Sequence, residues 1–314
     1  MEKNLTFYNV KANKRKTDKS VASLLFKIFA FIILFAYAIS LILPMVWSFV
    51  VSFQTPETYL IELKDQFSFY SFSQLFNMQN YVEVLSYFEI QVMAGVYVDI
   101  GGLILNSIMY SVGSALFQTL ACCLMAYIVA RFNFISSKII YTVVLIVMVL
   151  PIVGALPSQV QVLDFLGLYD TMTGLIILSS NFYGIHFLIL HASFKTIPKD
   201  FNEAAMIDGA GQWRIMLTIM IPLVKNALLT IFLLKFIAFW NDYQTPLLFA
   251  KSYPTLAYGL HWIQNGSGNH TDINLNTDPH KLAAAMLIFI PILVLFMFTH
   301  KRLMGNIAAG GIKG

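Results

Sequence analysis

The sequence predicts an all-α membrane protein with six transmembrane helices, and two observations support this. Only 11% of the 314 residues are charged and 58% are hydrophobic, whereas soluble domains have about 25% charged and 45–50% apolar residues. Apolar runs long enough to cross about 30 Å of hydrocarbon recur along the whole chain. They lie near 24–50, 102–130, 139–160, 173–193, 223–249 and 282–302.

The distribution of basic residues predicts how these spans are oriented. Of the 20 Lys and Arg residues, 16 lie before or at the start of span one, between spans two and three, between spans four and five, or after span six. Lys and Arg concentrate in the cytoplasmic loops of membrane proteins. Both chain termini are therefore expected in the cytoplasm. The first run is too long for a cleaved signal peptide and is expected to stay as an anchor.

The spans divide the chain into a basic N-terminal tail (1–22), a six-span membrane domain (23–304) and a Gly-rich C-terminal tail (305–314). The basic tail is expected to lie against anionic lipid headgroups. The long outer segment, 54–100, is acidic and rich in aromatic residues. Two interpretations of it stay open, namely an aromatic belt at headgroup level and a contact surface for a soluble partner.

A polar island, Phe194 to Asn226, separates the apolar runs of spans four and five. Phe201, Ala204 and Ala205 fall on one helical face at i, i+3, i+4 spacing. Gly209 supplies the backbone freedom that ends a helix, and apolar periodicity resumes after it. The island is therefore predicted to be a short helix, a Gly turn and a second helix, with a thin first helix that a partner protein can approach closely.

This island resembles the cytoplasmic coupling loop of binding-protein-dependent ABC importer permeases, a loop expected here at 195–222. The family carries Glu-Ala-Ala, three residues, Gly, nine residues and Ile-x-Leu-Pro. Glu203-Ala204-Ala205, Gly209 and Ile219 stand at the matching positions, and Ile221-Pro222 differs only by Ile in place of Leu. The resemblance implies docking on a cytoplasmic ATPase through five coupling residues. They are Glu203, Ala204, Ala205, Asp208 and Gly209.

Further motifs extend the resemblance over most of the chain. Pro44-x-x-Trp47 is similar to the end of the first span in maltose-type permeases, and Trp240-Asn241-Asp242-Tyr243 is similar to a recurring element of their fifth span. Phe76 to Tyr81 resembles the family's F-x-x-x-N-Y element. These matches point to the carbohydrate-uptake branch, and to the shorter of the two maltose-type permease subunits. The fold implied is that of a type I ABC importer permease.

The resemblance implies an ATP-driven sugar or oligosaccharide importer in a bacterial plasma membrane. In that importer, this chain forms half of the translocation path. The implied partners are a second permease subunit, a cytoplasmic ATPase dimer and an extracytoplasmic solute-binding protein. The sequence carries no Walker A loop, metal-ligand cluster or nucleophile–base pair. The chain is therefore expected to be no enzyme and to hold no cofactor, with ATP and Mg used by the partner ATPase. No nucleic-acid partner is expected either.

Polar residues inside the membrane are costly unless they face a cavity or one another, and so they are candidates for the path or its gate. Four are selected: Asn106, Gln118, Asn241 and Asp242. Two interpretations of Asp242 stay open, a hydrogen bond at a helix end or between helices and a role in the path or gate. Lys235 has a similar ambiguity, since it is either an internal ion-pair partner or a cation that lines the path.

A different class of transporter, an ion-coupled secondary carrier of a small polar solute, is the alternative. Such carriers place charged groups mid-membrane to hold the coupling ion. Here the clear intramembrane charges are Asp242 and Lys235, and no inverted repeat is evident in the sequence. A channel is a third possibility, without a recognisable filter. The sequence does not specify which sugar is carried.

Overall fold

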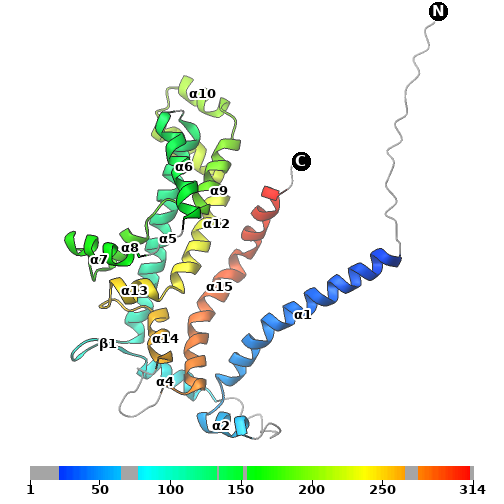
Figure 1. Ribbon diagram of the computed structural model, residues 1–314, viewed down its shortest axis with the longest axis vertical. Coiled ribbons are helices and arrows are strands. Elements are labelled where there is room, and N and C mark those ends of the chain that lie inside the picture. Colours follow the sequence, from blue (N-terminus) through cyan, green and yellow to red (C-terminus); the bar gives the residue numbers. More distant parts are fainter. Residues whose placement is uncertain (1–20, 65–76, 133, 151–153, 266–274, 312–314) are drawn as a thin grey trace, which may run out of the picture. The chain divides into compact units, whose positions relative to one another are not determined.

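The computed structural model describes residues 21–64, 77–132, 134–150, 154–265 and 275–311. The described chain is mostly helical, with one antiparallel hairpin of β1 (Ile90–Met93) and β2 (Val96–Val98) (Figure 1). Gly95 adopts φ +77° at the hairpin turn, where such a conformation suits glycine. The hairpin lies in the predicted outer segment, so the expectation of an all-α chain is wrong there, because short alternating Val, Ile and Tyr residues favour a strand.

The chain forms two compact units, 1–50 and 51–314. The described part of the first unit is one helix, α1 (Val21–Val51), with Pro44 inside it. Its 31 residues give a length of about 46 Å, enough to cross a bilayer. Most of its described side chains are apolar and exposed in this chain alone. Its composition and length agree with the predicted first span.

The second unit is built around α5 (Ile100–Arg131), which packs along α12 (Ile221–Trp240) (Figure 1). Two more helices flank this pair, α9 (Ile185–Thr196) against α5 and α15 (Asp278–Gly311) against α12. Within the described ranges, four helices are long and apolar enough to cross a membrane. They are Ser23–Val51, Ile100–Arg131, Gln212–Trp240 and Asp278–His300, which match predicted spans one, two, five and six.

The runs predicted as spans three and four are not single helices. The third contains α6 (Ile135–Val149) and α7 (Leu156–Phe165), and Pro157 lies in the first turn of α7, where its missing N–H costs no helical bond. The fourth contains α8 (Met172–Ser179) and then α9. Gly184, with φ +116°, lies in the break before α9. The count of six membrane crossings therefore stays a prediction.

The fifth apolar helix begins earlier and ends earlier than predicted. α11 (Gln212–Ile215) continues through one π turn, η1 (Met216–Met220), into α12. Pro222 explains the π turn, because its ring would clash with a carbonyl four residues back. The N–H of Ile221 instead reaches the carbonyl of Met216, five residues back. After Trp240 the chain turns into a separate short helix, α13 (Gln244–Phe249), so the predicted end at 249 is wrong.

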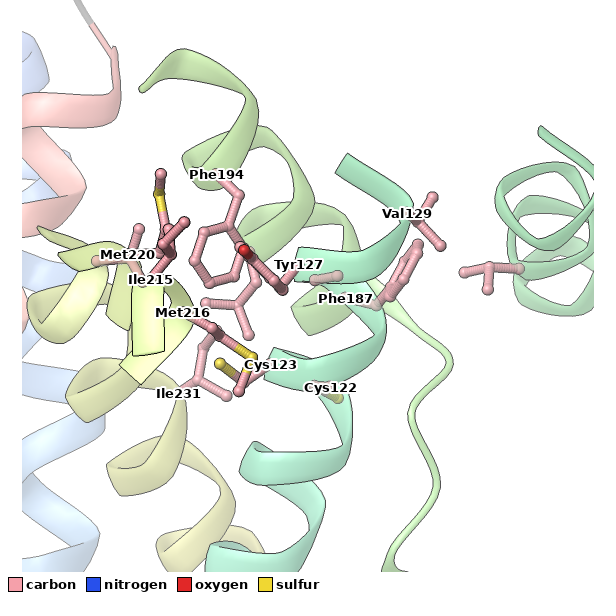
Figure 2. Packing of buried hydrophobic residues seen from close by; sticks show 14 of the residues in the cluster. Cys122, Cys123, Tyr127, Val129, Phe187, Phe194, Ile215, Met216, Met220 and Ile231 are labelled. Carbon is pink, nitrogen blue, oxygen red and sulfur yellow. The ribbon is translucent and has the colours of Figure 1, made fainter. Parts of the chain in front are cut away.

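Three buried clusters follow one another along α5. The first surrounds Tyr127 and joins α5 to α9 and to the α11–α12 helix through Phe187, Phe194, Ile215 and Met216 (Figure 2). The second gathers at the start of α5, around Leu103 and Trp240, and the third around Tyr110 and Phe249. A fully buried aromatic or aliphatic side chain contributes about 1.5–3 kcal/mol in water. In a membrane the same contacts mainly give close packing, because lipid is as apolar as the core.

At the end of the unit where α5 begins, hydrogen bonds join α4 (Gln79–Tyr87) to the chain that follows α1. Asn80 Nδ2 donates to the carbonyls of Ser52 at 2.8 Å and Gln54 at 2.7 Å. The Tyr81 hydroxyl lies 2.7 Å from Ser52 Oγ. Burial raises the pKa of the Tyr81 phenol above 10.0, although the Ser52 hydrogen bond opposes this. The Asn-Tyr pair of the F-x-x-x-N-Y element thus has a structural role, fixing the start of the second unit.

Two further contacts complete this end of the unit. His280 Nε2, in α15, lies 2.6 Å from Glu83 Oε2, in α4. The remaining described helices here are α2 (Pro56–Lys64) and α14 (Leu256–Gln264). The Asn106 side chain of α5 donates to the carbonyl of Pro254, just before α14, at 3.0 Å. The described part of the outer segment from α4 to β1 is therefore packed onto the helices of the second unit.

Candidate functional site

The first candidate surface is an elbow formed by α10 (Asp200–Ile207), which is labelled in Figure 1, and α11. Gly209 has φ +77°, in the left-handed region that favours glycine. The N–H of Ala210 donates to the carbonyl of Ala205 at 2.9 Å, and that of Gly209 donates to Met206 at 3.0 Å. This pair of bonds is a Schellman motif, which satisfies carbonyls at the helix end. The predicted helix, Gly turn and second helix are confirmed.

The five predicted coupling residues lie together on this elbow but do not share one environment. Glu203, Ala204, Asp208 and Gly209 are exposed. Ala205 is only 7% exposed and belongs to the cluster shown in Figure 2. The small side chain at 205 therefore lets α10 lie close to its own core. A partner protein that approaches the elbow meets Ala204 and not Ala205.

Large apolar side chains beside the coupling residues are exposed. Ile207 is 86% and Trp213 is 70% exposed, and Phe201 and Met206 are about half exposed. Grouped apolar side chains on a polar turn mark an interaction site more often than an isolated exposed Leu does. These residues lie at the end of the helix pair, on a loop and its flanking turns. The elbow therefore has the composition of a docking surface.

Beneath the elbow is a pocket of about 320 Å³ with a positive lining. Arg131, Lys195 and Lys199 contribute cations, and Glu203 contributes the carboxylate. Arg131 Nη2 donates to Met220 Sδ at 3.4 Å, whereas its buried Nε has no hydrogen-bond partner in the part of the chain that the structure describes. Glu203 thus lies among cations of its own chain, and this arrangement favours an intramolecular role for it.

The second candidate site is an open pocket of about 640 Å³ beside the middle of α5. Its walls come from α5, α7, α8, α12, α13 and α14, so segments far apart in the sequence build it. A pocket of this size suits a drug-sized or disaccharide-sized solute. The polar or charged residues that line it are Gln118, Gln159, Ser179, Asn181, Lys235, Tyr243, Gln244, Thr245 and His261.

Of the predicted path residues, Gln118 lines this pocket. Its Nε2 donates to Asn181 Oδ1 at 3.0 Å, and Asn181 lies in the break between α8 and α9. Lys235, half-buried on α12, lines the same pocket. Among the described residues no carboxylate lies within 4 Å of the Lys235 ammonium. The interpretation of Lys235 as a cavity-lining cation is thus favoured over an internal ion pair.

Asn106, Asn241 and Asp242 do not line the pocket and have structural partners. Asn241 Nδ2 donates to the carbonyl of Ile237 in its own helix at 2.8 Å. Asp242 Oδ2 accepts from the Tyr110 hydroxyl at 2.7 Å, and its Oδ1 accepts from the N–H of Thr245 at 3.1 Å. Asp242 therefore accepts a hydrogen bond from the first turn of α13 and joins that turn to α5. The helix-end interpretation of Asp242 is favoured over a gate.

Several pocket residues were not among the selected candidates. Gln159, like Gln118, is an amide within a predicted span, so the same sequence criterion could have identified it. His261 carried no signal, because it lies in an outer segment of the sequence. The structure stacks its ring on Tyr243, with centroids 4.2 Å apart and planes at 18°. Only the packing of α14 against α13 brings this aromatic pair to the pocket.

Comparison with known proteins identifies the family. The sequence profile of the binding-protein-dependent transport system inner membrane component matches residues 118–308. The chain belongs to this family. It is 25% identical to a diacetylchitobiose uptake system permease protein of Streptomyces coelicolor, over 88% of this chain and 86% of that one. It is 29% identical to a trehalose/maltose transport system permease protein of Thermococcus litoralis, over 88% and 93%.

A solved structure with the same fold supports the architecture. It is a bacterial ABC transporter involved in the import of the acidic polysaccharide alginate, with a TM-score of 0.72 and 20% identity, covering 90% of this chain and 98% of that chain. The chain therefore has the type I ABC permease fold and is a membrane permease of an importer. The ion-coupled secondary carrier has no support from these comparisons.

Proposed function

We propose that this permease is a six-span subunit of an ATP-driven importer for a sugar or oligosaccharide, with both termini in the cytoplasm. The observation that carries the proposal is the elbow of α10 and α11, an exposed apolar surface on a turn that Gly209 fixes. A cytoplasmic ATPase dimer docks there. Nucleotide-driven closure of that dimer pushes α10, and the rigid turn passes the movement to the helices.

The continuous helix that starts after the elbow supports this coupling. α11, η1 and α12 run without a break from Gln212 to Trp240, and Lys235 of the pocket lies on that same helix. A displacement at the elbow is thus passed along a single rigid element to the pocket. Packed helices transmit such movements because close-packed interfaces shift between discrete arrangements.

Carbohydrate cargo is proposed on two grounds. The relatives named above are permeases for diacetylchitobiose and for trehalose and maltose. The pocket also presents several amides and hydroxyls beside an aromatic pair. Hydroxyl groups are expensive to strip of water, so a sugar path must replace their hydrogen bonds. Aromatic rings supply the apolar surface that most ligand pockets also carry.

The test is to tag this chain, purify it gently from its native membrane and identify its companions by mass spectrometry. We expect an ATPase, a second permease and a solute-binding protein, with a carbohydrate bound to the last. A variant with Trp213→Ser and Ile207→Ser should lose the ATPase and keep the second permease. Recovery of the chain without an ATPase, in a form that still drives uptake, would contradict the proposal.

A further inference from the structure

Lys235 is a charged residue at an unusual place. It lies on a long apolar helix, five residues before the helix ends at Trp240, and it is half-buried. Charged side chains within membrane-spanning helices are costly, and they face a cavity, a partner charge or both. Lys235 faces the pocket of about 640 Å³. The pocket therefore provides its environment.

The pocket lacks a compensating negative charge. None of the described residues that line it is Asp or Glu. The nearest acidic residue on the same segment, Asp242, already accepts hydrogen bonds from the Tyr110 hydroxyl and the Thr245 N–H. Among the described residues, therefore, none that lines the pocket offers the Lys235 ammonium a carboxylate.

The rest of the lining suits a sugar. Gln118 and Asn181 form an amide pair at 3.0 Å on one side of the cavity. Gln244 and Thr245 begin α13 on another. Tyr243 and His261 form a stacked aromatic face at the same cavity. Amides, a hydroxyl and an aromatic face are suited to bind a polyhydroxylated ring. The Lys235 ammonium can in addition bind an acidic substituent on such a ring.

We propose that Lys235 binds the acid group of an anionic carbohydrate, a carboxylate or a phosphate ester, within this subunit's own pocket. The inference rests on the proposed importer function and narrows its cargo to acidic sugars. Lys binds such groups as a compact charge with freely rotating donors, so both acid groups satisfy it. Pairing of Lys235 with a carboxylate of the second permease is the competing outcome, and the experiment separates the two.

The experiment uses the complete importer in nanodiscs and three radiolabelled probes, glucose, glucuronate and glucose 6-phosphate. Binding is measured by equilibrium dialysis for the wild type, Lys235→Gln, Lys235→Arg and Lys225→Gln. Lys225 is an exposed lysine on the same helix and serves as the matched control. Loss of a hydrogen bond to a charged group corresponds to about 10- to 100-fold in affinity. We expect at least one acid to bind more tightly than glucose, and Lys235→Gln to remove that preference.

Lys235→Arg should keep the preference, because it keeps the charge, and Lys225→Gln should leave it unchanged. Tighter binding of glucuronate alone identifies a carboxylate site. Tighter binding of glucose 6-phosphate alone identifies a phosphate site. Equal binding of all three probes by the wild type would overturn the inference. A Lys235→Gln variant that loses the second permease during purification would overturn it as well, in favour of a subunit contact.

The cargo that elutes from the co-purified binding protein gives an independent answer. An acidic carbohydrate supports the inference, and Lys235→Gln should then slow its uptake about 10- to 100-fold. A neutral sugar overturns the inference but leaves the importer function in place. Failure to recover any ATPase or binding protein, by contrast, counts against the proposed function itself.

Discussion

The left-handed turn at Gly209 gives the sharpest prediction for the coupling elbow. Gly209→Ala places a Cβ at φ +77° without any steric contact, since nothing lies within 4 Å of the added atom. The cost is therefore backbone strain alone, about 1–2 kcal/mol for an L-residue in this region. The Ala210 N–H, which donates to the Ala205 carbonyl at 2.9 Å, reports on the turn. Its hydrogen exchange should accelerate through local opening.

Gly211→Ala is the matched control for this prediction. Gly211 also has open space around its added Cβ, but its backbone is extended, with φ −71° and ψ 159°. Both substitutions restrict the unfolded chain equally, a gain of about 0.4–1 kcal/mol. The difference between the variants thus isolates the strain, and it corresponds to about 5- to 30-fold in exchange rate. Gly209→Asn should fall between them, because Asn tolerates the left-handed region.

The assay is hydrogen exchange with mass spectrometry on peptides that cover 205–212, together with cargo-stimulated ATPase activity in the reconstituted importer. Under the proposed coupling, the variant with the faster exchange also shows the weaker stimulation. Equal exchange in Gly209→Ala and Gly211→Ala would refute the reasoning, because it would mean that the φ of residue 209 does not constrain the turn.

Three further predictions concern contacts inside the second unit, each read by thermal unfolding of the detergent-purified chain. Tyr110→Phe removes the hydrogen bond to the Asp242 carboxylate from a fully buried site. The free energy of unfolding should fall by about 1.5–3 kcal/mol. An unchanged stability would mean that another donor replaces the hydroxyl. Ala205→Leu overfills the packed side of α10 and should lower the free energy of unfolding by about 1–3 kcal/mol. Ala204→Leu, on the exposed side, should change it by no more than about 0.5 kcal/mol. Equal losses of stability would show that both faces are packed. Asn80→Ala removes the Asn80 amide, which donates to the carbonyls of Ser52 and Gln54. The free energy of unfolding should fall by about 1–3 kcal/mol for each of these carbonyls that water does not reach. An unchanged melting temperature would indicate that water reaches both.

The coupling elbow was predictable because its rules are local. An i, i+3, i+4 apolar pattern, a helix-ending Gly209 and a second periodic run act within about a dozen residues. The sequence could not say which of Ala204 and Ala205 faces the core, since both lie on neighbouring parts of one helical turn. That choice depends on the buried cluster that Ala205 joins, which includes side chains of α5, a helix far away in the sequence.

The interruption at 173–193 was missed because hydrophobicity measures length and polarity but not continuity. In the run at 139–160, Pro151 and Pro157 are residues that kink or end a helix, and the structure has a break there between α6 and α7. The β-hairpin was missed for a related reason, since its strands of four and three residues are shorter than the windows over which periodicity is read. A mean over many residues hides a local break.

The sequence by itself determined the class of protein, the four long apolar helices and the coupling motif, because apolar length and short-range spacing are written in the order of residues. Only the tertiary structure decided the roles of the polar residues. In the structure, Asp242 accepts a hydrogen bond from Tyr110. Lys235 faces a cavity that has no carboxylate among the described residues that line it. The physical reason is that the energy of a buried polar group depends on which partner reaches it, and Tyr110, the partner of Asp242, is 132 residues away in the chain.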